Sequence, residues 1–377
     1  MSRFLNSRFQ GLDAYTPGEQ PKDMVYVKLN TNESPYPPSP EVIGAITAEE
    51  VKLLKLYPDP EAKILKEKIA NLYGVTSKNV FVSNGSDDIL NFAFMAFCGD
   101  GKIANFPDIT YGFYKVFADL HNVKYNALPL KYDFTIDIEK YFNANGMVVI
   151  ANPNAPTGIA LTVDEVESIV ANNKDNVVLI DEAYIDFGGE SCYKLTEKYD
   201  NLLVVQTFSK SRSMAGARLG FAIASEGIIE DLEKIKYSTN PYNINRLTMV
   251  AGEAAIDSNE YYMDNCKKIC ETREYTTTEL EKLGFEVIPS KANFVFAKHG
   301  VIDGEKIYEE LKANGVLVRH FTAERICQYN RITIGTKEQM DIAADNIEKE
   351  LENRLEFFLT ENKLLEHQRL EQRTRHD

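Results

Sequence analysis

Residues 202–221, LLVVQTFSKSRSMAGARLGF, place two cations beside a run of apolar residues. Lys210 follows the run directly after Ser209, and Arg218 comes eight residues later. A lysine at a strand end is usually a solvated charge, but it can also form a Schiff base when neighbouring cations and poor solvation lower its pKa. Arg218 supplies such a cation, and together with Ser209 it could hold a phosphate group. The stretch therefore allows a nucleophilic amine beside a phosphate site.

The segment VSNGSDD, residues 82–88, ends a second apolar run. Gly85 permits a tight turn, so Ser86 and Asp87 are expected at the N-terminus of the helix that follows. The free N–H groups and the dipole of a helix N-terminus bind anions, and they suit phosphate best. The alternative is an ordinary helix cap formed by Ser86 or Asp87. These residues alone leave both interpretations open.

Two further strand ends carry unusual residues. Asp181 follows the apolar run NVVLI, which places a carboxylate at the end of a buried strand. An ionised carboxylate is costly there unless a cation meets it, and a structural salt bridge is the simplest case. The turn NPNAPTG, residues 152–158, follows MVVIA and suggests an unusual backbone with a cis X-Pro bond.

The part of the chain that must position these residues alternates strand and helix patterns. Runs of strand length, among them NVFVS, KIANF, NVKYNALPL, MVVIA, NVVLI and LLVVQTF, alternate with segments such as TVDEVESIVANN. In that segment Val163, Val166, Ile169 and Val170 lie on one face of a helix. The alternation predicts an α/β domain with a largely parallel, buried sheet.

The pattern changes at about residue 243, where one long helical stretch begins and reaches Gly284. The strands FEVIPS, NFVFAK, VLVRH and NRITIGT follow, with the helix GEKIYEELKANG among them and a long helix after Lys337. This order predicts a smaller α+β domain. We expect an N-terminal segment, 1–35, that packs with the small domain, a large domain over 36–255, the small domain over 256–360 and a polar tail over 361–377.

Composition excludes several classes of protein. The chain has 377 residues, a formal charge of -15 and a pI of about 5.0, which argue against nucleic acid as a partner. The first residues have no apolar core for a signal peptide, and no stretch approaches the roughly 18 apolar residues of a membrane span. The five cysteines have no zinc-site spacing, so we expect a cytoplasmic protein with reduced thiols and no metal. They are Cys98, Cys192, Cys266, Cys270 and Cys327.

A phosphate cradle, a buried carboxylate and an activated lysine together match one cofactor, pyridoxal 5′-phosphate. This cofactor bonds to a lysine amine, and a carboxylate keeps its pyridine nitrogen protonated so that the ring accepts electrons. The interpretation joins Lys210, Asp181 and the turn at Gly85 in one site.

Motifs in one order along nearly the whole chain resemble those of the fold-type I pyridoxal-phosphate enzymes, the aspartate aminotransferase superfamily. Within it, the chain is most similar to the histidinol-phosphate aminotransferase family. The motifs are YTPGEQP, KLNTNESPYPPSP, LYPDP, SNGSDD, PDITYGFY, NPNAPTG, DEAY, FSKSRSMAGARLGF, VLVRH and NRITIGT. The resemblance implies a three-layer, mostly parallel sheet like that of aspartate aminotransferase in the large domain, beside the smaller α+β domain.

The resemblance also implies roles around the cofactor. Lys210 bonds the cofactor covalently and then moves a proton between the substrate carbon and the cofactor. Asp181 pairs with the pyridine nitrogen, Tyr184 donates to the phenolic oxygen, and Tyr111 stacks on the ring. Tyr57 is expected to reach the phosphate held by the neighbouring subunit, which makes the enzyme a homodimer. The residues expected around the phosphate within one subunit are Gly85, Ser86, Asp87, Ser209 and Arg218.

For the substrate, the resemblance points to Tyr15, Asn32, Arg319 and Arg331. Related enzymes use the arginine at position 331 for the α-carboxylate of an amino acid. Histidinol phosphate lacks that carboxylate, so Arg331 is expected to share the substrate phosphate with Arg319 and Tyr15. A guanidinium suits either anion, which lets glutamate use the same pocket. The alternative is a pair of surface charges at strand ends.

One position departs from the family pattern. Relatives usually carry Asn directly before the PTG of the NPNAPTG turn, where its amide helps to hold the phenolic oxygen of the cofactor. This chain has Ala155 there and Asn154 one residue earlier. Either Asn154 reaches in through a shifted backbone, or Tyr184 holds that oxygen alone.

The resemblance implies transamination of L-histidinol phosphate with 2-oxoglutarate, giving imidazole-acetol phosphate and glutamate, in histidine biosynthesis. Two alternatives keep the fold and the cofactor: an aromatic amino-acid aminotransferase and a threonine-phosphate decarboxylase. A third, a non-catalytic pyridoxal-phosphate-binding regulator, is disfavoured because only about thirty residues precede the first core motif and the charge is acidic.

Overall fold

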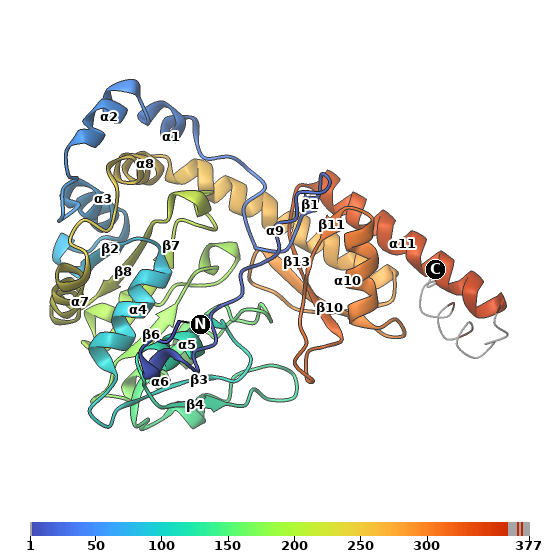
Figure 1. Ribbon diagram of the computed structural model, residues 1–377, viewed down its shortest axis with the longest axis horizontal. Helices are drawn as coiled ribbons and strands as arrows, with labels where there is room; N and C mark the ends of the chain where they lie inside the picture. Colours follow the sequence, from blue (N-terminus) through green and yellow to red (C-terminus); the bar gives the residue numbers. More distant parts are fainter. Residues whose placement is uncertain (1, 361–367, 369–370, 372–377) are drawn as a thin grey trace.

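A seven-stranded sheet forms the centre of the larger domain (Figure 1). The computed structural model describes residues 2–360 together with residues 368 and 371. The strand order is β2-β8-β7-β6-β5-β3-β4, and the strands from β7 to β4 pair in parallel, whereas β8 is antiparallel to both β7 and β2. The strands are β2 (Val80–Ser83), β3 (Ile103–Pro107), β4 (Tyr125–Leu128), β5 (Gly146–Ala151), β6 (Val178–Asp181), β7 (Leu202–Thr207) and β8 (Gly220–Ala224).

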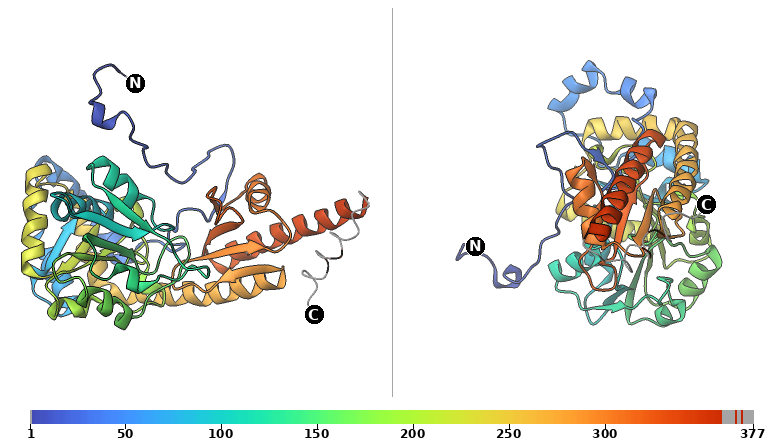
Figure 2. Two further views of the ribbon diagram at one scale, coloured as in Figure 1. Left: turned by 90° about the horizontal axis from the view of Figure 1, so that it is seen from below. Right: turned by 90° about the vertical axis from the view of Figure 1, so that its right-hand side faces the viewer.

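Apolar residues on both faces bury this sheet between two layers of helices (Figures 1 and 2). On β5, Met147 and Val149 pack against α4 (Ser86–Phe97), α5 (Phe113–Leu120) and α7 (Glu226–Thr239). The alternate residues of the strand, Val148 and Ile150, pack on the opposite side. That side is covered by α3 (Lys63–Tyr73), α6 (Val163–Ala171) and α8 (Arg246–Asp257). The predicted three-layer fold with a mostly parallel sheet is confirmed.

The smaller domain contains a four-stranded antiparallel sheet in the order β12-β13-β10-β9. Its strands are β9 (Phe285–Ile288), β10 (Phe294–His299), β12 (Arg319–His320) and β13 (Tyr329–Thr333). Its helices are α9 (Asn259–Lys282), α10 (Gly304–Ala313) and α11 (Lys337–Thr360). Their apolar faces share one core with β10 and β13, so this unit has the α+β character that the sequence predicts.

Two details of the sequence prediction were wrong. The helical stretch from residue 243 to Gly284 is two helices, α8 and α9, because the backbone of Ser258 leaves the helical conformation, with φ of -95° and ψ of 27°. The run VLVRH is also two short strands: β11 (Val316–Leu317) pairs with β1 (Val27–Lys28), and β12 pairs with β13. Each half of VLVRH therefore joins a different sheet.

The N-terminal segment contacts both domains. Its strand β1 pairs with β11 of the small domain. Earlier in the segment, Tyr15 stacks on Phe113 of α5 with ring centroids 4.1 Å apart. The short helices α1 (Pro40–Ala45) and α2 (Ala48–Lys52) follow and project from the large domain (Figure 1). Apart from residues 368 and 371, the tail predicted over 361–377 lies outside the described residues.

Within the described residues, no helix combines the length and the apolar character that a membrane crossing requires.

Candidate active site

A cavity of about 390 Å³ lies where the carboxyl ends of β6 and β7 meet the N-terminal segment and the small domain. Most of the predicted site residues line it. They are Tyr15, Asn32, Ser86, Asp87, Tyr111, Asp181, Tyr184, Ser209, Lys210, Arg218, Arg319 and Arg331. Gly85 lies directly behind the guanidinium of Arg218, which lines the cavity. Tyr57 is not among the lining residues. Residues that are scattered over more than 300 positions of the sequence thus share one cavity.

One end of the cavity is built around the turn at Gly85. This residue has φ of 85° and is the N-cap of α4, and no side chain caps the helix. The first N–H groups of α4 are therefore free for a ligand, contrary to a cap by Ser86 or Asp87. A Cβ at position 85 would lie 2.7 Å from Nη2 of Arg218 and would force that guanidinium to shift, and the positive φ itself favours glycine.

Arg218 is fixed at this end by polar contacts. Its Nη1 donates to Oγ of Ser209 at 3.3 Å, and its Nη2 donates to Oδ2 of Asp87 at 3.1 Å. The residue has φ of 56°, a left-handed conformation that is uncommon outside glycine and that clusters at functional sites. The arrangement gathers a guanidinium, a hydroxyl and a helix N-terminus, which are the groups that bind phosphate.

Asp181 lies at the end of β6 and is buried. Its Oδ2 accepts a hydrogen bond from the hydroxyl of Tyr114 at 2.8 Å, and its Oδ1 accepts one from the backbone N–H of Ala183 at 3.3 Å. Burial raises the pKa of Asp181 to about 6, and the Tyr114 hydrogen bond partly opposes the shift. Among the described residues no cation forms an ion pair with this carboxylate, so the structural salt bridge is not present in the protein itself.

Lys210 projects from the loop after β7 into the middle of the cavity. Its Nζ donates to the backbone carbonyl of Thr31 at 3.0 Å. Burial, followed by the charge of Arg331, lowers the pKa of Lys210 to about 8, and Arg218 contributes less. The cation that most affects the amine is therefore Arg331 rather than the sequence neighbour Arg218.

Tyr184 lies beside the lysine, with its ring centroid 5.7 Å from Nζ of Lys210. Its hydroxyl accepts a hydrogen bond from Nδ2 of Asn32 at 3.0 Å, and Oδ1 of Asn32 accepts one from Oγ1 of Thr333 at 2.9 Å. The N-terminal segment and the small domain thus orient Tyr184. Burial is the main cause that raises its pKa, while Arg331 and the Asn32 hydrogen bond oppose the shift.

The NPNAPTG turn has cis bonds before both Pro153 and Pro156, as its composition suggests. Ala155 lines the cavity, whereas Asn154 is buried behind it. Nδ2 of Asn154 donates to the carbonyl of Ile109 at 2.9 Å, and its Oδ1 accepts from Oγ1 of Thr110 at 2.7 Å. Both polar groups of the Asn154 side chain are therefore bonded to the segment 109–110, and Ala155 rather than Asn154 faces the cavity.

The opposite end of the cavity holds Tyr15, Arg319 and Arg331. Both guanidinium carbons lie 6.0 Å from the ring centroid of Phe321, so the two cations share one aromatic side chain. Nη2 of Arg331 donates to the carbonyl of Asn30 at 3.0 Å, but its Nε is buried without a partner. Neither arginine has an ion pair among residues 2–360. Both cations are partly buried and line the cavity, which ordinary surface charges at strand ends would not do.

Two tyrosines are placed less directly. The hydroxyl of Tyr111 donates to Oδ1 of Asp87 at 2.8 Å, which fixes its ring at the wall of the cavity, and its stacking role stays a prediction. Tyr57 is 79% exposed, so its predicted contact with a neighbouring subunit also stays a prediction.

Sequence reasoning missed three contributors: Tyr114, Phe321 and the carbonyl of Thr31. Tyr114 comes three residues after Tyr111 on the same chain segment, and Phe321 follows Arg319 closely. These spacings are signals only in retrospect, because an aromatic residue beside a motif is more often part of the core. No sequence signal marks the Thr31 carbonyl.

A family model for aminotransferase class I and II matches residues 25–347. A second model, for the UvrB third helical domain, matches residues 338–377, which overlap α11. The chain is 54% identical over 354 residues to a histidinol-phosphate aminotransferase of Brachyspira hyodysenteriae, covering 94% of this chain and 100% of that protein. A Clostridium acetobutylicum relative of the same name is 51% identical over 349 residues, covering 93% of this chain and 99% of that protein.

Among solved structures, the fold is similar to that of the histidinol-phosphate aminotransferase from Clostridium acetobutylicum. The TM-score is 0.79 at 25% sequence identity, and the superposition covers 87% of this chain and 99% of that chain. The family match spans both domains and every segment that lines the cavity except the one that carries Tyr15 and Gly18. The chain therefore belongs to the aminotransferase class I and II family and is an aminotransferase.

Proposed function

We propose that this chain catalyses the pyridoxal 5′-phosphate-dependent transamination of L-histidinol phosphate with 2-oxoglutarate, which gives imidazole-acetol phosphate and glutamate in histidine biosynthesis. We further propose that it acts in the cytoplasm as a homodimer. The names and the high identity of the relatives support the substrate. One observation carries the proposal: two guanidinium groups without ion-pair partners among the described residues share the cavity with an amine of lowered pKa.

The residues present fit the cofactor. The free N–H groups of α4, Ser209 and Arg218 would hold its phosphate, Asp181 would meet its ring nitrogen, and Lys210 would bond to its aldehyde carbon. The position of Arg218 depends on Gly85, because a Cβ there would displace the guanidinium. When bound, the cofactor supplies an electron sink for the electrons of the broken C–H bond.

Lys210 is suited to move the substrate proton. An amine with a pKa of about 8 exists in both protonation states near neutral pH, so it can accept a proton and return it to a neighbouring atom. The Thr31 carbonyl, 3.0 Å from Nζ, orients the amine when it is not bonded to the cofactor. Asp181, with a pKa of about 6, is ionised at neutral pH and can keep a proton on a ring nitrogen that faces it.

The arginine end recognises the substrate by charge. A phosphate group offers several acceptor oxygens, which two guanidinium groups and the Tyr15 hydroxyl can share. The buried Nε of Arg331 gains a partner when such an anion binds. A carboxylate of 2-oxoglutarate or glutamate can occupy the same place in the other half-reaction, because the pocket selects charge and hydrogen-bond acceptors rather than phosphorus.

An exposed apolar surface supports the homodimer. It runs along residues 43–57 from α1 through α2 to the tyrosine that is expected to reach the second subunit. Its members are Ile43, Ile46, Val51, Leu54, Leu56 and Tyr57, each of which is exposed. Clustered exposed apolar side chains of this kind mark protein–protein contacts.

The test is to follow the visible absorbance of the cofactor in the purified, loaded protein. L-histidinol phosphate should bleach it rapidly, and 2-oxoglutarate should restore it. Phenylalanine and threonine phosphate are run in parallel. Bleaching by phenylalanine alone would make the protein an aromatic aminotransferase, and carbon dioxide release from threonine phosphate would make it a decarboxylase.

A further inference from the structure

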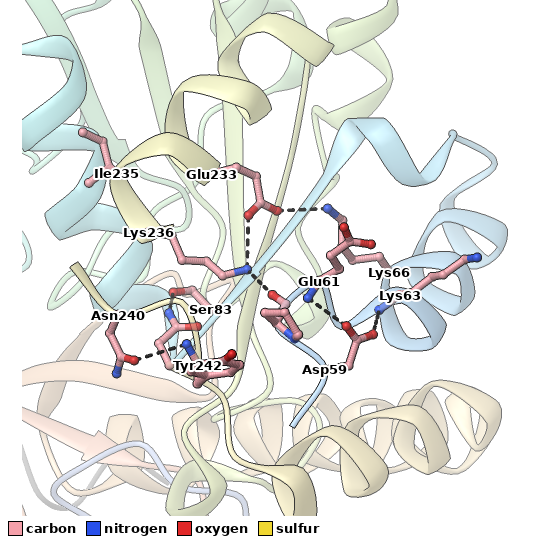
Figure 3. A network of polar contacts seen from close by, with 12 residues as sticks. Asp59, Glu61, Lys63, Lys66, Ser83, Glu233, Ile235, Lys236, Asn240 and Tyr242 are labelled. Atoms are coloured by element: carbon pink, nitrogen blue, oxygen red, sulfur yellow. Dashed lines mark hydrogen bonds and ion pairs between the residues drawn. The ribbon is translucent and has the colours of Figure 1, made fainter. Parts of the chain in front are cut away.

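The segment 57–62, which carries Tyr57, contacts the last turns of α7 and the loop that follows this helix. Figure 3 shows Lys236 of α7 directed toward the segment of Asp59 and Glu61. The ring of Tyr57 stacks on that of Tyr242, with centroids 4.5 Å apart and planes inclined by 20°. The same ring is 79% exposed, so its other face is open to solvent. The protein thus supports one face of the ring and offers the other outward.

Lys236, in the last turns of α7, is the second support. Its side chain is 1% exposed, and its Nζ donates to the carbonyl of Pro60 at 3.0 Å and pairs with Oε2 of Glu233 at 3.1 Å. The ammonium also lies 5.6 Å from the ring centroid of Phe81. Burying an ammonium costs several kcal/mol unless it is fully paired, and an apolar residue beside Phe81 would avoid that cost. An apolar residue could make neither the ion pair to Glu233 nor the hydrogen bond to Pro60, and only the second of these holds the segment 57–62.

Two residues after Tyr57 the chain forms a turn, residues 59–63, that its own hydrogen bonds close. Oδ1 of Asp59 accepts from the N–H of Glu61 at 3.0 Å, and its Oδ2 accepts from the N–H of Lys63 at 2.9 Å. Ala62 is buried and has φ of 47°, which turns the chain into α3. Because these bonds close a compact turn, an anchor at the Pro60 carbonyl holds the whole turn.

Hydrogen bonds in the loop after α7, residues 240–243, fix the backbone of Tyr242. The N–H of Asn240 donates to the carbonyl of Lys236 at 2.9 Å, and Oδ1 of Asn240 accepts from the N–H of Tyr242 at 3.2 Å. Next to it, Nδ2 of Asn243 donates to Oδ2 of Asp88 at 2.7 Å. Asp88 belongs to the first turn of α4, whose N-terminus is the proposed phosphate site.

We propose that Lys236 is a positioning residue which, together with Tyr242, holds Tyr57 in place for the cofactor phosphate of the partner subunit. The inference rests on the proposed function, because it needs the cofactor and the homodimer. Through this support, α7 and the loop after it connect the segment of Tyr57 to α4, the helix whose N-terminus is the proposed phosphate site of the same chain.

The decisive measurement is the dissociation constant of pyridoxal 5′-phosphate, obtained by titrating the apoprotein. Tyr57→Phe should weaken it about tenfold, the effect of losing one hydrogen bond to a charged group. Lys236→Met should also weaken it about tenfold, because Tyr57 loses its anchor. The variant does not strand Glu233, which keeps Lys66 at 3.0 Å. Lys66→Met is the matched control: it removes an ion pair to the same carboxylate without touching the segment 57–62, and should leave the constant unchanged.

The double variant separates positioning from general stability. If Lys236 acts through Tyr57, Lys236→Met should add less than about threefold in the Tyr57→Phe background, because coupled residues are not additive. A full additional tenfold loss would overturn the inference. Hydrogen exchange of the amides of residues 61–63 in the apoprotein should quicken in Lys236→Met and not in Lys66→Met.

Tyr242→Ala repeats the test at an exposed side chain, so a failure of Lys236→Met to fold does not remove it. It should weaken cofactor binding about as much as Lys236→Met does. In the Tyr57→Phe background it should likewise change the dissociation constant by less than about threefold. If Tyr57→Phe itself leaves cofactor binding unchanged, the inference is overturned. Bleaching by histidinol phosphate then reports separately whether the proposed transamination stands.

Discussion

The two ends of the cavity both attract anions, but they balance their charge differently. Arg218 has a carboxylate at 3.1 Å, a hydroxyl and a helix N-terminus beside it, all from the large domain. Arg319 and Arg331 have no ion pair within the described chain, and the Nε of Arg331 is buried without a partner. Burial lowers the pKa of Arg331, because removing the guanidinium from water disfavours its charged form.

The difference matches two kinds of ligand. A cofactor that stays bound suits a site whose groups are held by the protein itself, as Ser209 and Asp87 hold Arg218. A substrate that comes and goes gains affinity from charge that is left uncompensated. We therefore expect an anion to gain more binding free energy from Arg319 and Arg331, which have no ion pair, than from Arg218, which already pairs with Asp87.

The largest expected effect comes from Lys210, which lies between the two ends. Lys210→Ala should lower kcat by at least about 10⁴-fold, the upper end of what one acid–base group contributes. The variant keeps Arg218 at one end of the cavity and Arg319 and Arg331 at the other. Histidinol phosphate should therefore still change the absorbance of the bound cofactor, with a dissociation constant similar to that of the unmodified protein. A variant that loses binding together with turnover would contradict the separation of the two ends.

The arginines at the two ends should fail in different ways. Arg331→Met should raise the KM of histidinol phosphate and of 2-oxoglutarate by about 100-fold, or about 3 kcal/mol for a hydrogen bond between charged groups. Arg218→Met should instead weaken cofactor binding and leave both KM values of the loaded enzyme within about threefold. Equal effects on both substrates and cofactor in each variant would break the comparison.

Arg319 sharpens the comparison within the substrate end. Phosphate offers more acceptor oxygens than a carboxylate, so Arg319→Met should raise the KM of histidinol phosphate about tenfold more than that of 2-oxoglutarate. Steady-state kinetics with each substrate varied at saturation of the other measures the ratio. Equal changes would mean that Arg319 recognises charge without distinguishing the two anions.

The protonation of Lys210 gives a pH prediction. Only the neutral amine attacks the cofactor aldehyde, and the pKa is lowered to about 8. The rate at which apoprotein bonds the cofactor should therefore rise about tenfold per pH unit up to about 8 and level off above it. Because Arg331 helps to lower this pKa, Arg331→Met should move the midpoint to higher pH. A midpoint that is unmoved would mean that burial and Arg218, without Arg331, lower the pKa of Lys210.

The smallest effect is expected at position 155. Ala155→Asn would restore a donor beside Tyr184, and a donor to the phenolic oxygen favours the deprotonated cofactor. The pH midpoint of the visible absorbance should fall by up to about one unit, equivalent to about 1.4 kcal/mol. A rise in the midpoint would show that the amide points elsewhere, as that of Asn154 does.

The position of the residues expected to hold the cofactor could be predicted because each is marked by its immediate sequence neighbours. Gly85, Asp181 and Lys210 each stand where an apolar run stops, and a parallel sheet brings such positions together. The contacts of Tyr114 with Asp181 and of Thr31 with Lys210 were not predictable, since each joins segments that have no common pattern. The antiparallel pairing of β8 was also missed. Its link from β7 contains no α-helix, and a parallel crossover usually needs one.

The bond between Asn32 and Thr333 spans 301 residues of sequence. On a ribosome that adds about 5–20 residues per second, Asn32 waits about 15–60 s before its partner exists. The large domain can fold during that interval, but Tyr184 receives its orienting contact only when β13 has been made. A product truncated before residue 333 therefore retains Lys210 and Arg218 but lacks the contact that holds Asn32 against Tyr184.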